Sequence, residues 1–156
     1  MNRIILSIAG SCFLFCAASP QTAATVQKLK DRYKDYFTIG VAISPRALRS
    51  EERQLIESQF SGITAENAMK MGPIHPREQQ FNWGPADSII AFATRNHLPM
   101  RGHTLVWHNQ TPKWFFETAD GKQVEKETLL QRIHDHIDSV VTRYKGKVYA
   151  WDVVNE

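Results

Sequence analysis

The sequence predicts an α/β fold in which parallel strands alternate with helices. Strand and helix periodicities alternate strictly along the chain, with four strand patterns in all. Connections from helix to strand are short, whereas the loops after the second and third strands are long. No glycine-rich phosphate fingerprint follows any strand, which argues against a nucleotide-binding doubly wound fold. We therefore expect a (β/α) barrel or an open α/β sheet, with its site at the carboxyl ends of the strands.

The first strand and its helix are expected within residues 26–60. Residues 26–36 carry apolar side chains at helical spacing, and residues 37–43 alternate as a strand does. Ser50 suits the N-cap of the following helix, because a serine oxygen can accept a hydrogen bond from a free backbone N–H. That helix would pack Leu55, with its apolar neighbours, against the sheet.

The later elements are predicted from the same periodicities. Two histidines of the last helix, His134 and His136, lie two positions apart, so they point to different faces and are expected to be solvated. The final strand is a run of apolar residues and is expected to be buried. The expected elements are a strand from Ile63, a loop over 69–84, a helix from Pro85, a strand over 100–107, a helix over 129–144 and a strand over 148–154.

Composition indicates an ordinary globular chain. It has 156 residues, of which 42% are hydrophobic and 22% charged. The net charge of +3 comes from basic and acidic residues spread along the chain without a Lys/Arg block. We therefore expect no nucleic-acid partner.

Residues 1–24 resemble an export signal rather than part of the fold. Residues 4–18 are apolar but too short to span a bilayer comfortably, so no membrane span is expected. Both cysteines, Cys12 and Cys16, lie in this segment, which leaves the mature domain, residues 25–156, without a disulfide. We expect a secreted or periplasmic protein. A lipoprotein signal with lipid on Cys12 is the alternative.

Polar residues with complementary chemistry follow the second strand. Glu66, Asn67 and Lys70 offer a carboxylate, an amide and an ammonium group at one strand end. Together they can hydrogen-bond several hydroxyls of a neutral polyol. A surface salt bridge between Glu66 and Lys70 is the alternative, and it would be favoured if this cluster stood alone.

The third strand adds an imidazole and an indole. Strand alternation sends His103, Leu105 and Trp107 to one face, and Gln110 follows in the loop. An aromatic face beside hydrogen-bonding groups suits a sugar ring, which has apolar faces and a polar rim. A metal site at His103 and His108 is disfavoured, because their spacing matches no zinc motif.

The fourth strand carries Asn155 and Glu156 at its carboxyl end. A Glu there is either solvated at a loop start or held for chemistry. If Trp107 and apolar walls surround Glu156, desolvation favours its protonated form, which a general acid for a glycosidic oxygen needs.

Three of these stretches resemble successive signatures of the family 10 glycoside hydrolases, chiefly endo-β-1,4-xylanases. They are residues 63–70, 101–108 and 151–156, and residues 81–83 and 86–87 resemble a further family segment. The resemblance covers residues 26–156. It implies a (β/α)8 TIM barrel and a retaining, two-carboxylate mechanism on xylan or xylo-oligosaccharides, without cofactor or metal.

The resemblance also implies a role for each site residue. One departure is Met71, where relatives often have an aromatic residue, and only a local stacking contact is thereby in doubt. By position, Glu156 matches the acid/base and Asn155 the contact to the sugar 2-hydroxyl; Glu66, Asn67 and Lys70 match residues that bind sugars on the non-reducing side, and His103, Trp107 and Gln110 match the lining of the same subsites.

A retaining enzyme also needs a nucleophilic carboxylate about 5 to 5.5 Å from the acid. In the family it lies on a later strand. Glu66 and Asp152 are poor substitutes, since Glu66 matches a binding position and Asp152 is expected to be buried within the last strand. We expect this chain to hold the first four of eight units and to be inactive without the carboxyl-terminal half of its barrel. We call that longer protein the full-length protein; a natural short protein that binds xylan without cutting it is the alternative.

Overall fold

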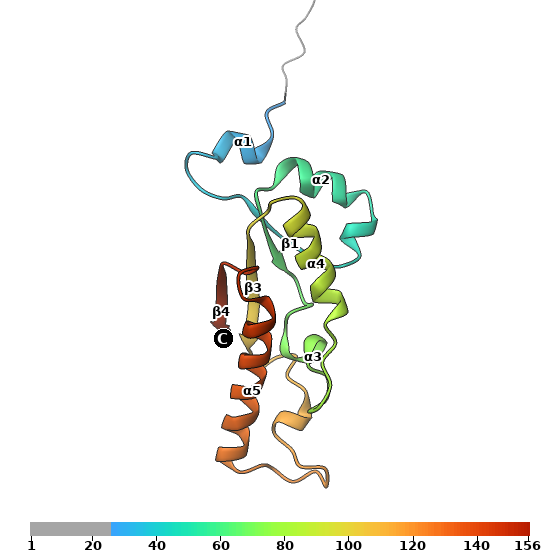
Figure 1. The fold of residues 1–156 in the computed structure, drawn as a ribbon, viewed down its shortest axis with the longest axis vertical. Helices are drawn as coiled ribbons and strands as arrows, with labels where there is room; N and C mark the ends of the chain where they lie inside the picture. The colour runs from blue at the N-terminus through green and yellow to red at the C-terminus, as the bar shows by residue number, and fades with distance from the viewer. Residues whose placement is uncertain (1–25) are drawn as a thin grey trace, which may run out of the picture.

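A computed structural model describes residues 26–156 as a sheet of four parallel strands (Figure 1). The predictions for residues 1–24, including Cys12 and Cys16, lie outside the described residues. Neighbouring strands are paired in chain order, β1-β2-β3-β4. The strands are β1 (Gly40–Ile43), β2 (Gly62–Ala65), β3 (Met100–Val106) and β4 (Ala150–Val154).

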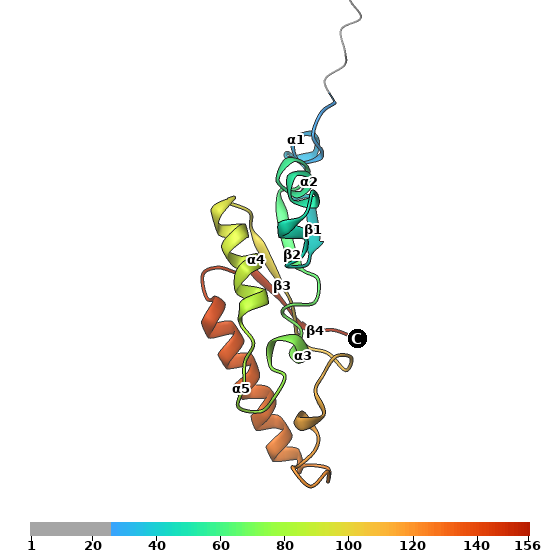
Figure 2. The same ribbon diagram turned by 90° about the vertical axis from the view of Figure 1, so that its right-hand side faces the viewer.

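Each of the first three strands is followed by a long helix, so the predicted alternation is confirmed. Helices α4 and α5 lie on the same side of the sheet (Figure 2). None of the described helices is both long enough and apolar enough to cross a membrane. The helices are α1 (Leu29–Tyr33), the 3-10 turn η1 (Ala47–Arg49), α2 (Glu52–Gln59), α3 (Met71–Ile74), α4 (Gly84–Arg95), the 3-10 turn η2 (Lys113–Phe115) and α5 (Lys126–Tyr144).

The core lies between the sheet and these helices. Burying this apolar surface stabilises the fold by roughly 25 cal/mol per Å². The most deeply buried large side chains include Ile63, Met69, Ile89, Phe92, Met100, Val140 and Tyr144.

Two predictions about α2 are wrong. Leu55 is 57% exposed, and the neighbouring Ile56 is the buried residue of this helix. Successive helical residues lie about 100° apart, and the rotation of α2 about its axis turns Ile56 rather than Leu55 toward the core. Ser50 does not cap α2, since its hydroxyl donates to the carbonyl oxygen of Ala47 at 3.1 Å. The chain makes the short turn η1 before α2, and Ser50 closes that turn instead.

The pairing of β3 with β4 sets which side chains share a face. Gly102 pairs with Trp151 and His103 with Asp152, and the register then shifts between His103 and Val106. Because of this shift Leu105 is buried in the core, 3% exposed, while His103 lies on the opposite face of the sheet. The prediction that His103 and Leu105 share a face is therefore wrong.

The expected burial of the last strand is also wrong for the described chain. Val153 is 55% and Val154 71% exposed. Strand β4 is an edge of the sheet, with β3 as its only neighbour among residues 26–156. Apolar side chains at an uncovered edge stay in water until another element packs on them.

Helices α4 and α5 are joined by a polar contact at their ends. Arg143 of α5 forms an ion pair with Asp87 of α4, and the hydroxyl of Tyr144 donates to the same carboxylate at 3.0 Å. The hydrogen bond from Arg143 is the main reason that the pKa of Asp87 lies below its usual value. The guanidinium of Arg143 also lies 4.6 Å from the ring centre of Trp83.

A buried histidine pair connects α5 to the loop after β2. His136 is fully buried, so its predicted solvation is wrong; His134, two residues away, is exposed. The Nδ1 atoms of His136 and His75 lie 3.2 Å apart, and Nε2 of His136 is 3.1 Å from the carbonyl oxygen of Leu105. Burial, then the neighbouring His75, lower the pKa of His136 to about 4. Two positive charges at this distance would repel, so the pair cannot be doubly protonated.

We predict that acid weakens the fold through His136. The pKa of His136 is lower in the folded than in the unfolded state. Its contribution to the free energy of unfolding is therefore complete above a pH of about 6.5, the unfolded pKa, and is lost as the pH falls toward about 4. The loss should reach about 3 kcal/mol, at about 1.4 kcal/mol per pKa unit. Urea unfolding of the full-length protein between pH 7 and 4.5 measures it.

Other groups titrate in the same range, so the comparison is between variants. His136→Gln should flatten the pH dependence relative to wild type, because the glutamine amide takes up no proton in this range. His134→Gln is the matched control, since His134 is exposed on the same helix. Equal pH dependence in all three proteins would contradict the prediction.

Candidate active site

The loop after β2 holds a buried ammonium group. Lys70 is 8% exposed, and its Nζ donates to Oδ1 of Asn67 at 2.9 Å. Nζ also lies 4.7 Å from the ring centre of Trp107, a cation–π contact. Lys70 forms no ion pair among the described residues, so the alternative, a salt bridge with Glu66, is absent there. An ammonium has three donors, so this group can also bind a ligand oxygen.

Gln110 joins this cluster because two loops approach closely. Its Nε2 lies 3.4 Å from Oδ1 of Asn67, and its backbone carbonyl accepts from the N–H of Gly72 at 2.7 Å. A Cβ at Gly72 would lie 2.6 Å from that carbonyl oxygen, so only glycine allows the approach. Gln110 has a φ of 58°, which is uncommon for a residue with a side chain. The loop after β3 is thus held against the start of α3.

Trp107 contributes an unpaired donor. Its Nε1 is the buried side-chain nitrogen that has no hydrogen-bond partner within residues 26–156. A buried unsatisfied donor costs about 1 to 3 kcal/mol. Such a group is typical of a site that a ligand completes.

His103 belongs to a polar group on the face of the sheet opposite the helices. Its Nδ1 donates to Oδ2 of Asp152 at 2.9 Å, and Arg101 donates to Oδ1 of the same carboxylate. Asp152 is not buried as predicted: its side chain is 25% exposed, because its register partner is His103 and both face away from the helices. The hydrogen bond from Arg101 is the main reason that the pKa of Asp152 is lowered, with His103 adding to the effect.

The end of β4 lies beside the end of β3. The N–H of Asn155 donates to the carbonyl of Val106 at 2.9 Å, and Nδ1 of His108 donates to the backbone carbonyl of Glu156. The Glu156 side chain is exposed. The apolar walls predicted around it are absent from the described chain, because β4 is an edge strand there.

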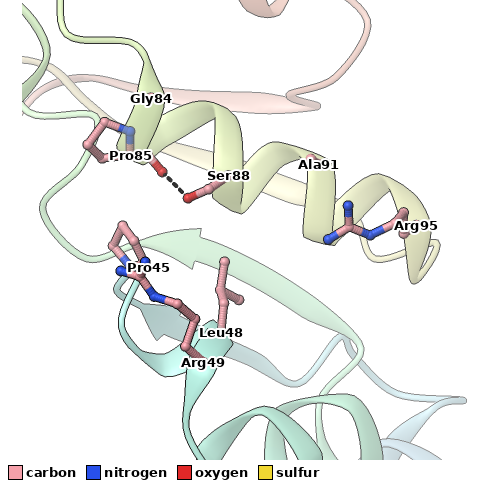
Figure 3. Close-up of a pocket in the computed structure, with 8 residues that line it drawn as sticks. All are labelled: Pro45, Leu48, Arg49, Gly84, Pro85, Ser88, Ala91 and Arg95. Atoms are coloured by element: carbon pink, nitrogen blue, oxygen red, sulfur yellow. Dashed lines mark hydrogen bonds between the residues drawn. The ribbon is translucent and has the colours of Figure 1, made fainter.

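Glu66 and His103 line a common hollow of about 370 Å³, formed with residues of β1 and β2. It lies on the sheet face that carries Asp152. A second hollow of about 500 Å³ lies between η1 and α4 (Figure 3). None of the predicted site residues lines it, and its Ser88 hydroxyl is already bonded to the carbonyl of Pro85 at 2.7 Å. The candidate site is therefore at the carboxyl ends of β2, β3 and β4.

The sequence of the described chain matches one known family. Residues 28–156 match the family described as glycosyl hydrolase family 10. The chain belongs to glycosyl hydrolase family 10. In this family the four parallel strands and their helices are part of a (β/α)8 barrel, so the predicted fold class is confirmed.

Several xylanases are similar to this chain. Endo-1,4-beta-xylanase B of Paenibacillus barcinonensis is 47% identical over 131 residues, which are 84% of this chain and 39% of that protein. An endo-1,4-beta-xylanase/feruloyl esterase of Xylanibacter ruminicola is 51% identical over 129 residues, 82% of this chain and 18% of that protein.

Among solved structures, a Paenibacillus barcinonensis xylanase complexed with a conduramine derivative has a TM-score of 0.81 and 46% identity. The matched region covers 86% of this chain and 40% of that chain. The present chain therefore spans less than half the length of each of these family 10 relatives.

Sequence reasoning missed Arg101 and Asp152 as members of this site. Alternation already sends Arg101 to the face of His103, and that signal was available. The position of Asp152 opposite His103 depends on the β3–β4 register, which the sequence does not state.

We predict that Gly72→Ala displaces the loop that carries Gln110. The added methyl group overlaps the Gln110 carbonyl, so the free energy of unfolding should fall by about 1 to 3 kcal/mol. Urea unfolding of the full-length protein measures the loss. Gly84→Ala is the matched control, because nothing lies within 4 Å of an added Cβ at that position. Equal stability of the two variants would refute the predicted contact.

Proposed function

We propose that the full-length protein hydrolyses internal β-1,4-xylosidic bonds in xylan with retention of configuration. The observation that carries this proposal is the family 10 match over residues 28–156, which includes all the polar strand ends described above. The similarity to family 10 xylanases supports xylan as the substrate. We also propose that residues 1–24 direct export to the periplasm or the medium, with lipid anchoring as the alternative.

The chemistry of the strand ends supports a sugar ligand. Asn67, Lys70 and Gln110 form one hydrogen-bonded cluster, in which Lys70 lies over the ring of Trp107. A xylose unit is neutral, with apolar ring faces and hydroxyls at its rim, and this combination suits it. Asn155, next to Glu156, is proposed to contact the sugar 2-hydroxyl at the cleavage point.

Glu156 is proposed as the general acid/base. It would protonate the leaving oxygen in the first step and deprotonate water in the second. The nucleophile is proposed to lie on a later strand, outside this chain. Asp152 is unsuited to that role, since Arg101 and His103 already occupy both of its carboxylate oxygens. We therefore expect this chain alone to be inactive.

We predict that Glu156→Ala separates the two roles of this residue. On xylan the leaving group is a sugar alkoxide, which departs poorly unless it is protonated. The kcat of the full-length enzyme on xylan should therefore fall by a factor of at least about 10² to 10⁴. On an aryl xylobioside with an acidic phenol, bond cleavage should survive while hydrolysis of the covalent intermediate becomes slow. Stopped-flow release of phenol should then show a burst and a slow steady state, which azide accelerates.

The control for this experiment is Glu127→Ala, which removes an exposed carboxylate from α5 and should change neither substrate's kinetics. Equal losses on xylan and on the aryl substrate, without a burst, would mean that Glu156 only binds substrate or supports the fold.

We predict that Lys70→Ala in the full-length enzyme lowers kcat/KM on xylan about ten-fold to a hundred-fold. The change removes a buried donor and the 2.9 Å hydrogen bond to Asn67, which then keeps only the longer contact from Gln110, at about 1 to 3 kcal/mol. Lys145→Ala, at the exposed end of α5, is the matched control. Steady-state kinetics that are the same in both variants would remove Lys70 from the site.

A further inference from the structure

We propose that Asp152 and Arg101 act as a positioning pair that holds His103 in one tautomer. In this tautomer Nδ1 carries the proton, and Nε2 presents a lone pair to a hydroxyl of the bound sugar. The inference deepens the function proposed above and rests on it. Neither Asp152 nor Arg101 needs to touch the substrate.

The geometry of the three residues defines the proton position. The two oxygens of Asp152 have different partners: Oδ2 lies 2.9 Å from Nδ1 of His103, and Oδ1 accepts from Arg101. A carboxylate only accepts hydrogen bonds and a guanidinium only donates them. Nδ1 of His103 must therefore be the donor in its bond to Asp152.

The pair is itself held in place by the strands. His103 and Asp152 are register partners on β3 and β4, and the hydroxyl of Thr104 donates to the backbone carbonyl of Asp152 at 2.9 Å. Arg101 lies two residues before His103 on the same face of β3. The hydrogen bond from Arg101 lowers the pKa of Asp152, so its carboxylate stays ionised as the pH falls.

The free end of His103 faces the candidate site. Nε2 makes no hydrogen bond to another described residue, and His103 lines the hollow of about 370 Å³ together with Glu66. Because Nδ1 is bonded to Asp152, Nε2 is the ring nitrogen that is left for a ligand in this hollow.

An acceptor at this position complements the rest of the site. The neighbouring cluster offers a ligand several donors, among them the ammonium of Lys70 and the indole N–H of Trp107, while Oδ1 of Asn67 already accepts from Lys70 and Gln110. A sugar hydroxyl both donates and accepts. A lone pair on His103 supplies a neutral acceptor for a hydroxyl proton beside the Glu66 carboxylate, and the reversed tautomer would turn it into one more donor.

Asp152→Asn tests the tautomer with little change in shape. Arg101 can only donate, so it takes the amide oxygen, and the amide NH₂ then faces Nδ1 of His103. Nδ1 becomes an acceptor and the proton moves to Nε2. In the full-length enzyme we expect kcat/KM on xylotetraose to fall about ten-fold to a hundred-fold, with a melting temperature close to that of wild type.

A second change should rescue the first. In Arg101→Met/Asp152→Asn no guanidinium claims the amide oxygen, so the amide can turn that oxygen toward Nδ1 and restore the original tautomer. We expect the double variant to be at least about five-fold more active than Asp152→Asn. A residue that only supports the fold would give the opposite result, since a second polar deletion adds damage.

The tautomer is read directly from the ¹⁵N chemical shifts of His103 in the full-length protein labelled at histidine. Protonated Nδ1 is expected in wild type and in the double variant, and protonated Nε2 in Asp152→Asn. Protonated Nε2 in wild type, full activity of Asp152→Asn, or a double variant weaker than Asp152→Asn would each overturn the inference.

This experiment also distinguishes the inference from the function it rests on. A wild-type enzyme without activity on any xylan substrate refutes the proposed function, whatever the ¹⁵N shifts show. An active wild type with no tautomer change in Asp152→Asn refutes the positioning pair and leaves the xylanase function standing.

Discussion

The parallel pairing of β3 with β4 is the contact on which the candidate site depends. It lays Trp151 over Gly102 on the side of the helices, where an added Cβ would overlap the indole ring. On the other side it sets His103 opposite Asp152. It also brings the end of β4 to the end of β3, where Asn155 donates to the carbonyl of Val106. A shift of one residue in this register would move every one of these side chains to the wrong face.

The two faces of the sheet divide stability from chemistry. The helix side is apolar and close-packed, with α5 tied to the sheet by the bond from His136 to the carbonyl of Leu105. The opposite side carries Arg101, His103 and Asp152. Polar groups can be kept there because they satisfy one another, and because the core does not depend on them.

The loops after β2 and β3 complete the site by packing against each other. The close approach of Gly72 to Gln110 brings Asn67 and Lys70 together with Trp107, which lies about 40 positions further along the chain. The result is a cluster rich in donors, and the neighbouring strand ends add two acceptors, the Glu66 carboxylate and the His103 ring. Donors and acceptors side by side suit hydroxyl groups, which both donate and accept.

The sequence by itself determined the elements and the residue types at the strand ends. Periodicity is local, so the four strands, the three long helices and the polar residues after β2, β3 and β4 could be predicted. Tertiary structure decided burial and pairing. Leu55, Leu105, His136 and Asp152 were all misjudged.

Each of these errors has a physical reason. Whether Leu55 is buried depends on the rotation of α2 about its axis. The burial of Leu105 depends on a register shift in β3. His136 is buried because His75, 61 residues away, offers it a partner. Asp152 faces His103 because two strands pair in one register out of several. These are long-range contacts, and a pattern of neighbouring residues does not contain them.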